Sequence, residues 1–349
     1  MQFSSDNWAG AHKAISAALA SRAGGFVGAY GSSELDRTVS EQFNTVFGRK
    51  VAVCFVGTGT AANALAMTAC NLAGGVVFAH SHSHVIEDEC GAVEHFTGGA
   101  RLHGVGGGFG KMDPDLLEKA ISKYASGFVH GGRPMAVTIT QASEAGTVYS
   151  LAEIAVISAI CRKHRLPLHM DGARFANALV SLGASAAQMT VEAGVDLVSF
   201  GGTKNGCWCA EALVVLDPKR FADLPYIQKR AAQLFSKTRF IASQFDAYFK
   251  DGLWLELAAH ANAMAARLAG HTHASPHMRL AWQPQANEVF VVMKERMANS
   301  LLAKGAAFYP WTVPDNYLGQ ITAGETLNRF VTSFATTKAE VDAFGKLTA

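Results

Sequence analysis

Short apolar runs alternate with helix-forming segments over much of the sequence, and this alternation limits the possible folds more than any other feature. Residues 51–56 form a continuous apolar run, and the alanine-rich residues 60–73 that follow have the pattern of a helix. Further strands are predicted over residues 76–79, 135–140, 166–170, 195–200 and 212–216, and further helices over 113–125, over 150–165 and from 185 onward. Such alternation is typical of a mostly parallel sheet covered on both faces, so the sequence predicts an α/β fold.

The pattern changes in the last third of the chain. Residues 226–269 read as largely helical, and residues 287–293 and 330–334 read as strands. We therefore expect two domains, because a chain of 349 residues exceeds the usual size of one. Residues 1–250 would form an N-terminal arm and a large domain, and residues 251–349 a smaller C-terminal α+β domain.

Charge and hydropathy exclude several classes of function. The sequence has 30 Lys and Arg against 28 Asp and Glu, which gives no basic surplus for binding nucleic acid. No apolar run approaches the roughly 20 residues that span a bilayer, so we expect no membrane partner. The first residues lack a basic stretch followed by an apolar one, and the six cysteines are scattered rather than framed as disulfides. We expect a cytoplasmic protein that acts on a small molecule.

Chemically useful residues follow the predicted strands. Open α/β sheets bind their ligands at the carboxyl ends of the strands, so these positions are the first candidates for a site. The segments concerned are residues 57–60, 80–84, 141–144, 171–174 and 201–204.

The first of these segments has the features of an anion site. Residues 57–62 read Gly-Thr-Gly-Thr-Ala-Ala between a strand and a helix, where backbone amides and the helix dipole favour negative charge. A dinucleotide site would require an acidic residue about 20 positions further on, and the first acid is Glu87. The sequence therefore favours a single phosphate group, with a tight turn that binds no ligand as the alternative.

Asp171 and Lys204 follow two other strands. Asp171 would face a ligand or cap the next helix, and it could instead form a surface pair with Arg174. Lys204 follows a buried strand and is flanked by glycines, and burial makes a lysine amine nucleophilic toward carbonyl groups. The neighbouring Thr203 could add a hydroxyl to a phosphate site.

Together these residues match one cofactor. Pyridoxal 5′-phosphate needs a phosphate site, an anion at its ring nitrogen and a lysine at its aldehyde. The order of phosphate loop, Asp171 and Lys204 is typical of the large domain of aspartate-aminotransferase-like enzymes, the fold type I class. We therefore predict this fold and this cofactor.

A histidine run adds a further possibility. Residues 80–84 read His-Ser-His-Ser-His, which on an extended segment would place three rings on one face. Imidazole is a common zinc ligand, but no further ligand motif accompanies the run, so we predict no metal site. The alternative is a ring stacked on the cofactor, with Glu89 polarising the site.

The order of these motifs resembles that of the low-specificity L-threonine aldolases along essentially the whole chain. The most specific stretch is residues 169–177, His-Met-Asp-Gly-Ala-Arg-Phe-Ala-Asn, and the lysine segment over residues 199–206 looks like the phenylserine aldolase branch. The other matching segments are Ser5-Asp6, residues 58–63, His84 with Glu89 and Gly91, and residues 329–333.

The resemblance implies roles for individual residues. Lys204 would hold the cofactor covalently and Asp171 would pair with its ring nitrogen. His84 would stack on the ring and take the β-hydroxyl proton, and His130 would be a second active-site histidine. The remaining implied residues are Gly59 and Thr60 for the phosphate, Ser5, Arg174 and Arg329 for the substrate carboxylate, and Tyr30 reaching into a neighbouring subunit's site.

The implied function is retro-aldol cleavage of L-β-hydroxy-α-amino acids to glycine and an aldehyde, in a homodimer or homotetramer with shared sites. Two segments, residues 7–12 and 141–144, depart from the family pattern and leave the preferred aldehyde open. The nearest alternative is another fold type I enzyme, such as a β-eliminating lyase or an aminotransferase. A non-catalytic binding protein and a metal-dependent hydrolase built on the histidine run are the alternatives from other classes.

Overall fold

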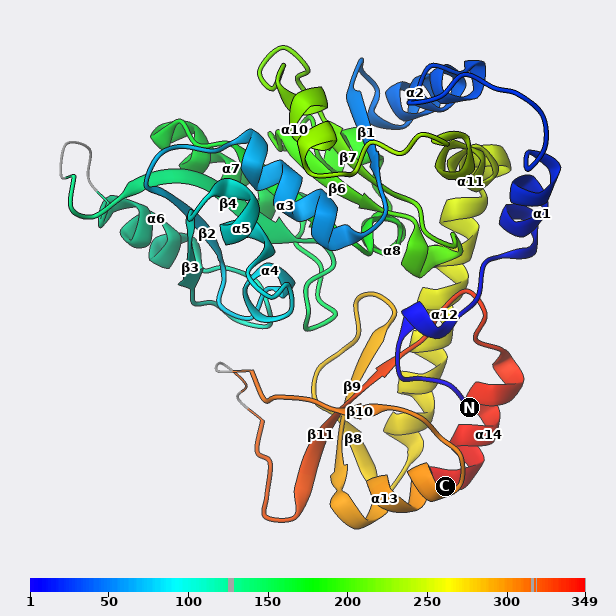
Figure 1. Cartoon of the computed structure of the whole chain (residues 1–349). Helices are drawn as coiled ribbons and strands as arrows, with labels where there is room; N and C mark the ends of the chain where they lie inside the picture. Colours follow the sequence, from blue (N-terminus) through cyan, green and yellow to red (C-terminus); the bar gives the residue numbers. More distant parts are fainter. Residues whose placement is uncertain (125–128, 315–316, 318, 349) are drawn as a thin grey trace.

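The computed structural model describes residues 1–348 except 125–128, 315–316 and 318. A seven-stranded sheet forms the larger of two domains (Figure 1). Across this sheet the strands are ordered β1 (Ala52–Val56), β7 (Glu211–Val215), β6 (Leu197–Gly201), β5 (Leu168–Gly172), β4 (Arg133–Thr140), β2 (Gly75–His80) and β3 (Arg101–Val105). Only β7 runs opposite to its neighbours, so the predicted mostly parallel sheet is confirmed.

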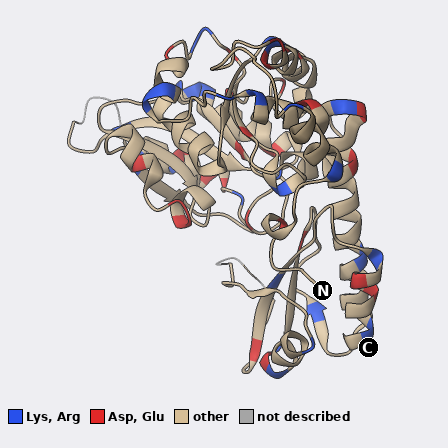
Figure 2. Ribbon diagram, turned by 45° about the vertical axis from the view of Figure 1, so that its right-hand side comes forward, with Lys and Arg blue, Asp and Glu red and all other residues tan. Residues whose placement is uncertain are grey.

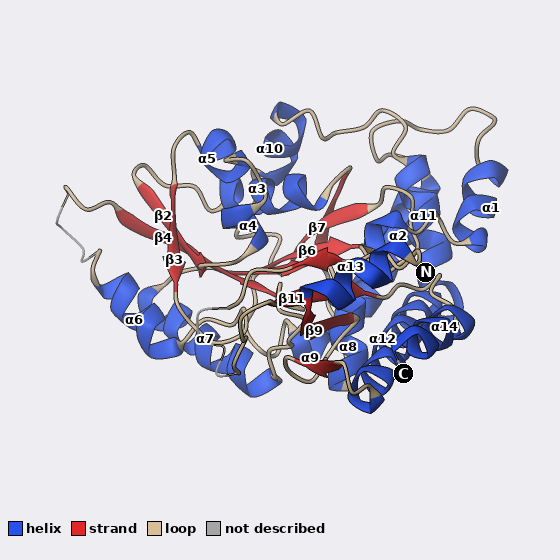
Figure 3. Ribbon diagram, turned by 90° about the horizontal axis from the view of Figure 1, so that it is seen from below, coloured by secondary structure: helices blue, strands red, loops and turns tan. Residues whose placement is uncertain are grey.

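Helices cover both faces of this sheet (Figure 3). Successive strand residues alternate between two cores: Val56, Val77 and Val215 lie in one, and Phe78 and Val214 in the other. The first core is covered by α3 (Gly59–Ala69), α5 (Ala92–Thr97) and α10 (Leu224–Arg230). The second is covered by α2 (Glu34–Phe47), α6 (Pro114–Ser122), α7 (Leu151–His164), α8 (Phe175–Leu182), α9 (Ala186–Met189) and α11 (Arg239–Phe249).

Local sequence signals explain where several helices begin. Ser150 and Glu153 form the predicted capping box of α7, in which each side chain satisfies a backbone amide of the other. Asp113 caps α6, with Pro114 in the first turn. These signals fix the connections that bring the next strand back to the sheet.

A four-stranded antiparallel sheet forms the smaller domain. Its order is β10 (Tyr309–Pro310), β11 (Glu325–Val331), β9 (Glu288–Lys294) and β8 (Met278–Leu280). The helices α12 (Leu253–Ala274), α13 (Glu295–Ala303) and α14 (Lys338–Thr348) accompany it, and α12 runs from the large domain into the small one (Figure 1). The short elements that remain are η1 (Asp6–Trp8), α1 (Lys13–Ser21), α4 (His84–Glu87), η2 (Thr203–Asn205) and η3 (Lys250–Gly252).

The first residues of the chain pack with the smaller domain. The Phe3 amide donates to the Ala307 carbonyl at 2.8 Å, and the Phe3 ring lies in the core beside Phe330 and Phe344. The assignment of residues 1–250 and 251–349 to two domains stays a prediction. Residue 250, the expected boundary, lies in η3, just before α12 begins.

Four strands differ from the sequence prediction: β3 and β11, and the short β8 and β10, which lie outside every predicted strand. The strand β3 was not predicted, because Arg101 and His103 interrupt any apolar run at this sheet edge. The strand predicted over residues 330–334 is instead β11, Glu325–Val331. Because its first half is polar, a search for apolar runs does not find the whole strand.

Charged residues of both signs are interspersed over the two domains (Figure 2). In the part of the chain that the structure describes, no helix combines the length and the apolar character that crossing a membrane requires.

Candidate active site

A cavity of about 240 Å³ lies at the carboxyl ends of the parallel strands. It brings together all five segments singled out from the sequence, because those segments follow neighbouring strands of one sheet. Their residues in its lining are Thr58, Gly59, Thr60, His84, Glu144, Asp171, Ala173, Thr203 and Lys204.

The amino end of α3 forms one side of the cavity. Thr58 caps the helix, and its Oγ1 accepts the Ala61 amide at 3.1 Å. The amides of Gly59 and Thr60 precede the first intrahelical donor and therefore have no partner within the helix. A Cβ built on Gly59 would meet no heavy atom within 4 Å, so the helix end faces open space. This geometry suits a phosphate group.

Lys204 lines the same cavity, from the one-turn helix η2 between β6 and β7. Beside it, the Thr203 amide donates to Glu211 Oε1 at 3.1 Å. Burial raises the pKa of Glu211 to about 7. Glu211 was missed in the sequence because it begins β7, and only in this antiparallel strand does the amino end lie at the ligand-binding edge.

The Asp171 carboxylate is buried and held by two donors. Asn63 Nδ2 lies 2.9 Å from Asp171 Oδ2, and the Ala173 amide lies 3.1 Å from Oδ1. The same Asn63 nitrogen donates to Glu89 Oε1 at 2.7 Å. Asn63 thus connects the two carboxylates across the floor of the cavity.

His84 joins this network through Glu89. The His84 Nδ1 atom lies 2.9 Å from Glu89 Oε1, and this hydrogen bond raises the pKa of His84. Burial raises the pKa of Glu89. A carboxylate on Nδ1 orients the imidazole ring and leaves Nε2 as the basic atom.

Arg174 does not form the surface pair with Asp171 that the sequence left open as an alternative. It is buried, and its Nε and Nη2 atoms lie 2.8 and 3.1 Å from the two oxygens of Asp6. Asn287 Nδ2 donates to Asp6 Oδ2 at 3.0 Å. Burial alone would raise the pKa of Asp6, but the charges of Arg174 and Lys204 outweigh it and the pKa is lowered.

The two arginines expected to bind a carboxylate are linked by a residue that the sequence did not reveal. Glu288 Oε1 lies 3.4 Å from Arg174 Nη2 and 3.6 Å from Arg329 Nη1. The Arg329 guanidinium also stacks 3.9 Å above the Trp311 ring centre. Ser5 caps η1, directly before Asp6, through its Oγ on the Asn7 amide. Glu288 begins β9. A search of the sequence for polar residues that follow strands does not find a residue at the start of one.

His130 and Tyr30 are not brought to this cavity. His130 is exposed and precedes β4 at the amino end of the strand, so the sheet separates it from the cavity. Tyr30 is exposed, and its backbone amide donates to the Ser236 carbonyl at 3.0 Å. The roles implied for both residues stay predictions.

The histidine run is not one extended segment. His80 ends β2 and His84 begins α4, so the three rings do not share a strand face. His80 and His82 line an adjoining cavity of about 420 Å³, together with Glu144 and Trp311. Within the described residues, no group of three or more His, Cys, Asp or Glu side chains is arranged to hold a metal ion.

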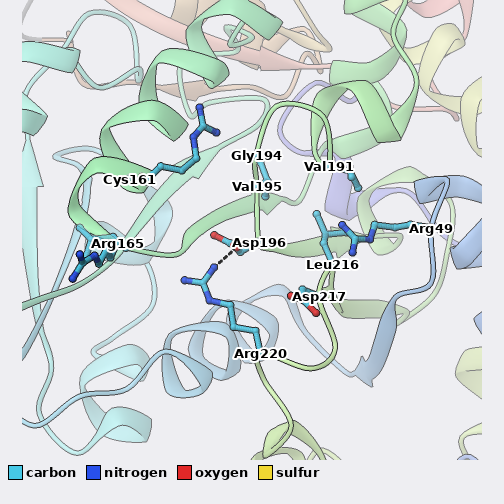
Figure 4. Close-up of a pocket in the computed structure, with 12 residues that line it drawn as sticks. Arg49, Cys161, Arg165, Val191, Gly194, Val195, Asp196, Leu216, Asp217 and Arg220 are labelled. Atoms are coloured by element: carbon cyan, nitrogen blue, oxygen red, sulfur yellow. Dashed lines mark hydrogen bonds and ion pairs between the residues drawn. The ribbon is translucent and has the colours of Figure 1, made fainter.

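A further cavity of about 460 Å³ lies at the other edge of the sheet (Figure 4). Asp196 and Arg220 form an ion pair there, while the guanidinium of Arg165 is turned away from them. None of the residues predicted for the site lines it. The polar network around Asp171 and Lys204 therefore marks the candidate active site.

The residues of the first cavity fit pyridoxal 5′-phosphate. The space beside Gly59 accommodates a group at the helix end, Asp171 offers a buried carboxylate, and Lys204 offers an amine in the same cavity. These are the anion site, ring-nitrogen partner and aldehyde partner that the cofactor requires.

Known proteins are similar to this chain in sequence and in fold. The family model of beta-eliminating lyases matches residues 2–296. A low specificity L-threonine aldolase from a Pseudomonas species is 38% identical over 308 residues, which cover 88% of each chain. The structure of Leishmania major threonine aldolase superposes with a TM-score of 0.91 at 28% identity, covering 99% of this chain and 98% of that chain. Oryza sativa TDC with PLP shares the fold, with a TM-score of 0.74 at 14% identity over 99% of this chain and 82% of that one.

Proposed function

The chain belongs to the beta-eliminating lyase family, and from this premise we propose that it cleaves L-β-hydroxy-α-amino acids to glycine and an aldehyde. Threonine, allo-threonine and phenylserine are the substrates we propose. The observation that carries the proposal is the meeting of Lys204, Asp171 and the amino end of α3 in one cavity, in a chain whose relative across 88% of its length is a threonine aldolase.

Pyridoxal 5′-phosphate is the cofactor that this membership and the shared fold imply, and when bound it supplies an electron sink beside the α-carbon of an amino acid. In this chain Lys204 would hold it covalently. The amides of Gly59 and Thr60 would hold its phosphate, with the Thr203 hydroxyl beside them. The Asp171 carboxylate, fixed by Asn63 and Ala173, would keep a proton on the ring nitrogen.

Arg174 and Arg329 provide the positive charge that an amino acid carboxylate needs. Their guanidinium groups meet at one point, since both lie within 3.6 Å of the same oxygen of Glu288. Charge-assisted hydrogen bonds from such a pair would orient the substrate rather than merely attract it. We propose that this orientation selects which bond at the α-carbon breaks.

His84 is the base that we propose for the β-hydroxyl proton. With Nδ1 on Glu89, its Nε2 atom is available to accept a proton, and Glu89 stabilises the imidazolium that results. Because a general base contributes about 10²–10⁴-fold, His84→Asn should lower kcat by a factor in that range.

The adjoining cavity is where we propose that the β-substituent lies. It shares Glu144 with the candidate active site, and Pro310, Trp311, Val313 and Pro314 give it an apolar wall. A phenyl group would gain from burial there, which supports phenylserine as a substrate.

A substrate panel tests the proposal. The holoenzyme is incubated with L-threonine, L-allo-threonine and phenylserine, and the aldehyde and glycine are measured directly. We expect equal amounts of both products from at least one substrate. Ammonia and a keto acid in their place would favour a β-eliminating lyase on the same fold. A keto acid without ammonia, formed only when a second keto acid is supplied to accept the amino group, would favour an aminotransferase.

We further propose a homodimer or homotetramer with active sites shared between subunits. The exposed Tyr30 supports this, because the resemblance gives that residue a place in a neighbouring subunit's site and it does not line the cavity of its own chain. Loss of activity when the protein is diluted to monomers would agree with active sites that are shared between subunits.

A further inference from the structure

Four charged side chains from distant parts of the sequence form one buried cluster beside the candidate active site. Asp6 pairs with Arg174 at 2.8 Å, Arg174 with Glu288 at 3.4 Å, and Glu288 with Arg329 at 3.6 Å. They come from the N-terminal segment, the residue directly before α8, β9 and β11. Two acids thus balance two arginines before any substrate carboxylate arrives.

The two acids of this cluster hold their charge unequally. Asp6 accepts hydrogen bonds from two nitrogens of Arg174 and from Asn287. Glu288 is fully buried, and neither of its oxygens has a hydrogen-bond partner among the described residues. A buried carboxylate without hydrogen bonds is costly to keep ionised. Of the two acids, Glu288 is therefore the one that more readily takes up a proton.

Four charged side chains act on Glu288 most strongly. Arg174 and Arg329 favour its ionised form, whereas Glu144 and Asp6 oppose it. Burial is the largest influence, and it raises the pKa of Glu288. The Glu288 Cβ also lies close to Gly146, since a Cβ built on that glycine would lie 3.0 Å from it.

A substrate carboxylate on Arg174 and Arg329 would place three acids against two arginines in a buried space. We propose that Glu288 takes up one proton from solvent when the substrate carboxylate binds, so that the cluster exchanges an internal anion for the anion of the substrate. This inference rests on the proposed function, which places the carboxylate on these two arginines. No other atom is transferred, and the proton returns to solvent when the amino acid leaves.

Proton uptake makes amino acid binding depend on pH in a defined way. Where free Glu288 is ionised, uptake of one proton weakens binding about tenfold for each unit of rising pH. The amino group of any ligand adds its own pH dependence. Ethanolamine has a similar amino group and no carboxylate, so it serves as the reference ligand.

Calorimetry counts the protons directly. Glycine is titrated into the holoenzyme at one pH in several buffers of different ionisation enthalpy, and the slope of enthalpy against buffer enthalpy gives the protons taken up. We expect the wild type to take up close to one more proton than Glu288→Gln. Ethanolamine should show no such difference. Glu325→Gln is the matched control, because Glu325 is paired with Arg279 at the far end of β11.

Equal proton counts for glycine in the wild type and Glu288→Gln would overturn the proposal. If Glu288→Gln fails to fold, the wild type alone decides, because the ratio of the glycine Kd to the ethanolamine Kd should rise about tenfold per pH unit, and a constant ratio would contradict the proposal. Neither readout requires cleavage. Failure of the proposed function therefore shows separately, as absence of aldehyde from the substrate panel.

Discussion

His84 and Glu89 form the hydrogen-bonded pair that sets the pKa of the proposed base. The 2.9 Å hydrogen bond that His84 Nδ1 donates to Glu89 raises the pKa of His84, so the base is protonated, and inactive as a base, up to a higher pH than an isolated histidine would be. In Glu89→Gln that contribution is lost and the pKa of His84 falls. The acidic limb of the kcat profile should therefore move to lower pH, as measured by initial rates across pH.

Glu87 offers a control for this shift. It lies on the same short helix as His84, and its carboxylate is half exposed and 3.7 Å from His82. Glu87→Gln should leave the acidic limb where it is in the wild type. A limb that stays unchanged in Glu89→Gln would show that His84 is not the titrating base.

His169 makes a different contribution, to stability. It is buried on β5, with Thr138 Oγ1 at 2.7 Å from one ring nitrogen and Ser199 Oγ at 2.9 Å from the other. Burial lowers its pKa to about 4. Because the unfolded chain binds the proton from about pH 6.5 downward, the free energy of unfolding should fall by about 3 kcal/mol between pH 6.5 and 4 through this residue alone.

Denaturant unfolding at several pH values measures this effect. His169→Asn should show a shallower loss of stability over that pH range than the wild type. The exposed His273→Asn should keep the slope of the wild type. A His169→Asn protein with the same slope as the wild type would contradict a neutral, buried His169.

At the amino end of α3, one substitution can test cofactor binding separately from folding. A methyl group on Gly59 would enter open space and would raise helix propensity, by up to about 1 kcal/mol at an interior position. Gly59→Ala should therefore unfold no earlier than the wild type, yet it should bind pyridoxal phosphate more weakly, because the methyl group occupies the place of the phosphate. Fluorescence titration of the apoprotein measures the affinity.

Gly183 provides the comparison for Gly59→Ala. It also has open space around an added Cβ, but its φ of +59° ends α8 in the left-handed region. Gly183→Ala should therefore lose stability and keep its cofactor affinity. Unchanged affinity in Gly59→Ala would place the phosphate elsewhere.

Elements built from local signals could be predicted, and those fixed by distant partners could not. The capping box of α7 and the apolar runs of β4, β5 and β6 are readable because neighbouring residues determine them. The reversed direction of β7 is set by its partners on both sides, and with it the place of Glu211 at the site. For the same reason Glu288 could not be predicted, because its role depends on one arginine at the start of α8 and another on β11.

At the scale of the whole molecule, the N-terminal segment connects the two domains. Phe3 lies in the core of the small domain, and Asp6 holds Arg174 of the large one. Both chain ends lie on the smaller domain in Figure 1. The resemblance implies a role for Ser5 in binding the substrate carboxylate, but no local pattern links Phe3 to Phe330 and Phe344.

Phe3→Ala tests this connection. Removing a fully buried ring should lower the free energy of unfolding by about 3–5 kcal/mol, and thermal unfolding should show the small domain melting first. Phe26 is fully exposed, so Phe26→Ala should change stability by no more than about 0.5 kcal/mol. Equal melting curves for Phe3→Ala and the wild type would contradict the packing.

We propose that one cofactor joins Lys204 and Asp171 in the cavity at the carboxyl ends of the strands. The most direct test is to reduce the holoenzyme with borohydride, digest it and locate the added pyridoxyl phosphate mass by peptide mass spectrometry. We expect that mass on Lys204 and its absence from every peptide of Lys204→Ala. Labelling of a different lysine, or of none, would contradict the proposed role of Lys204.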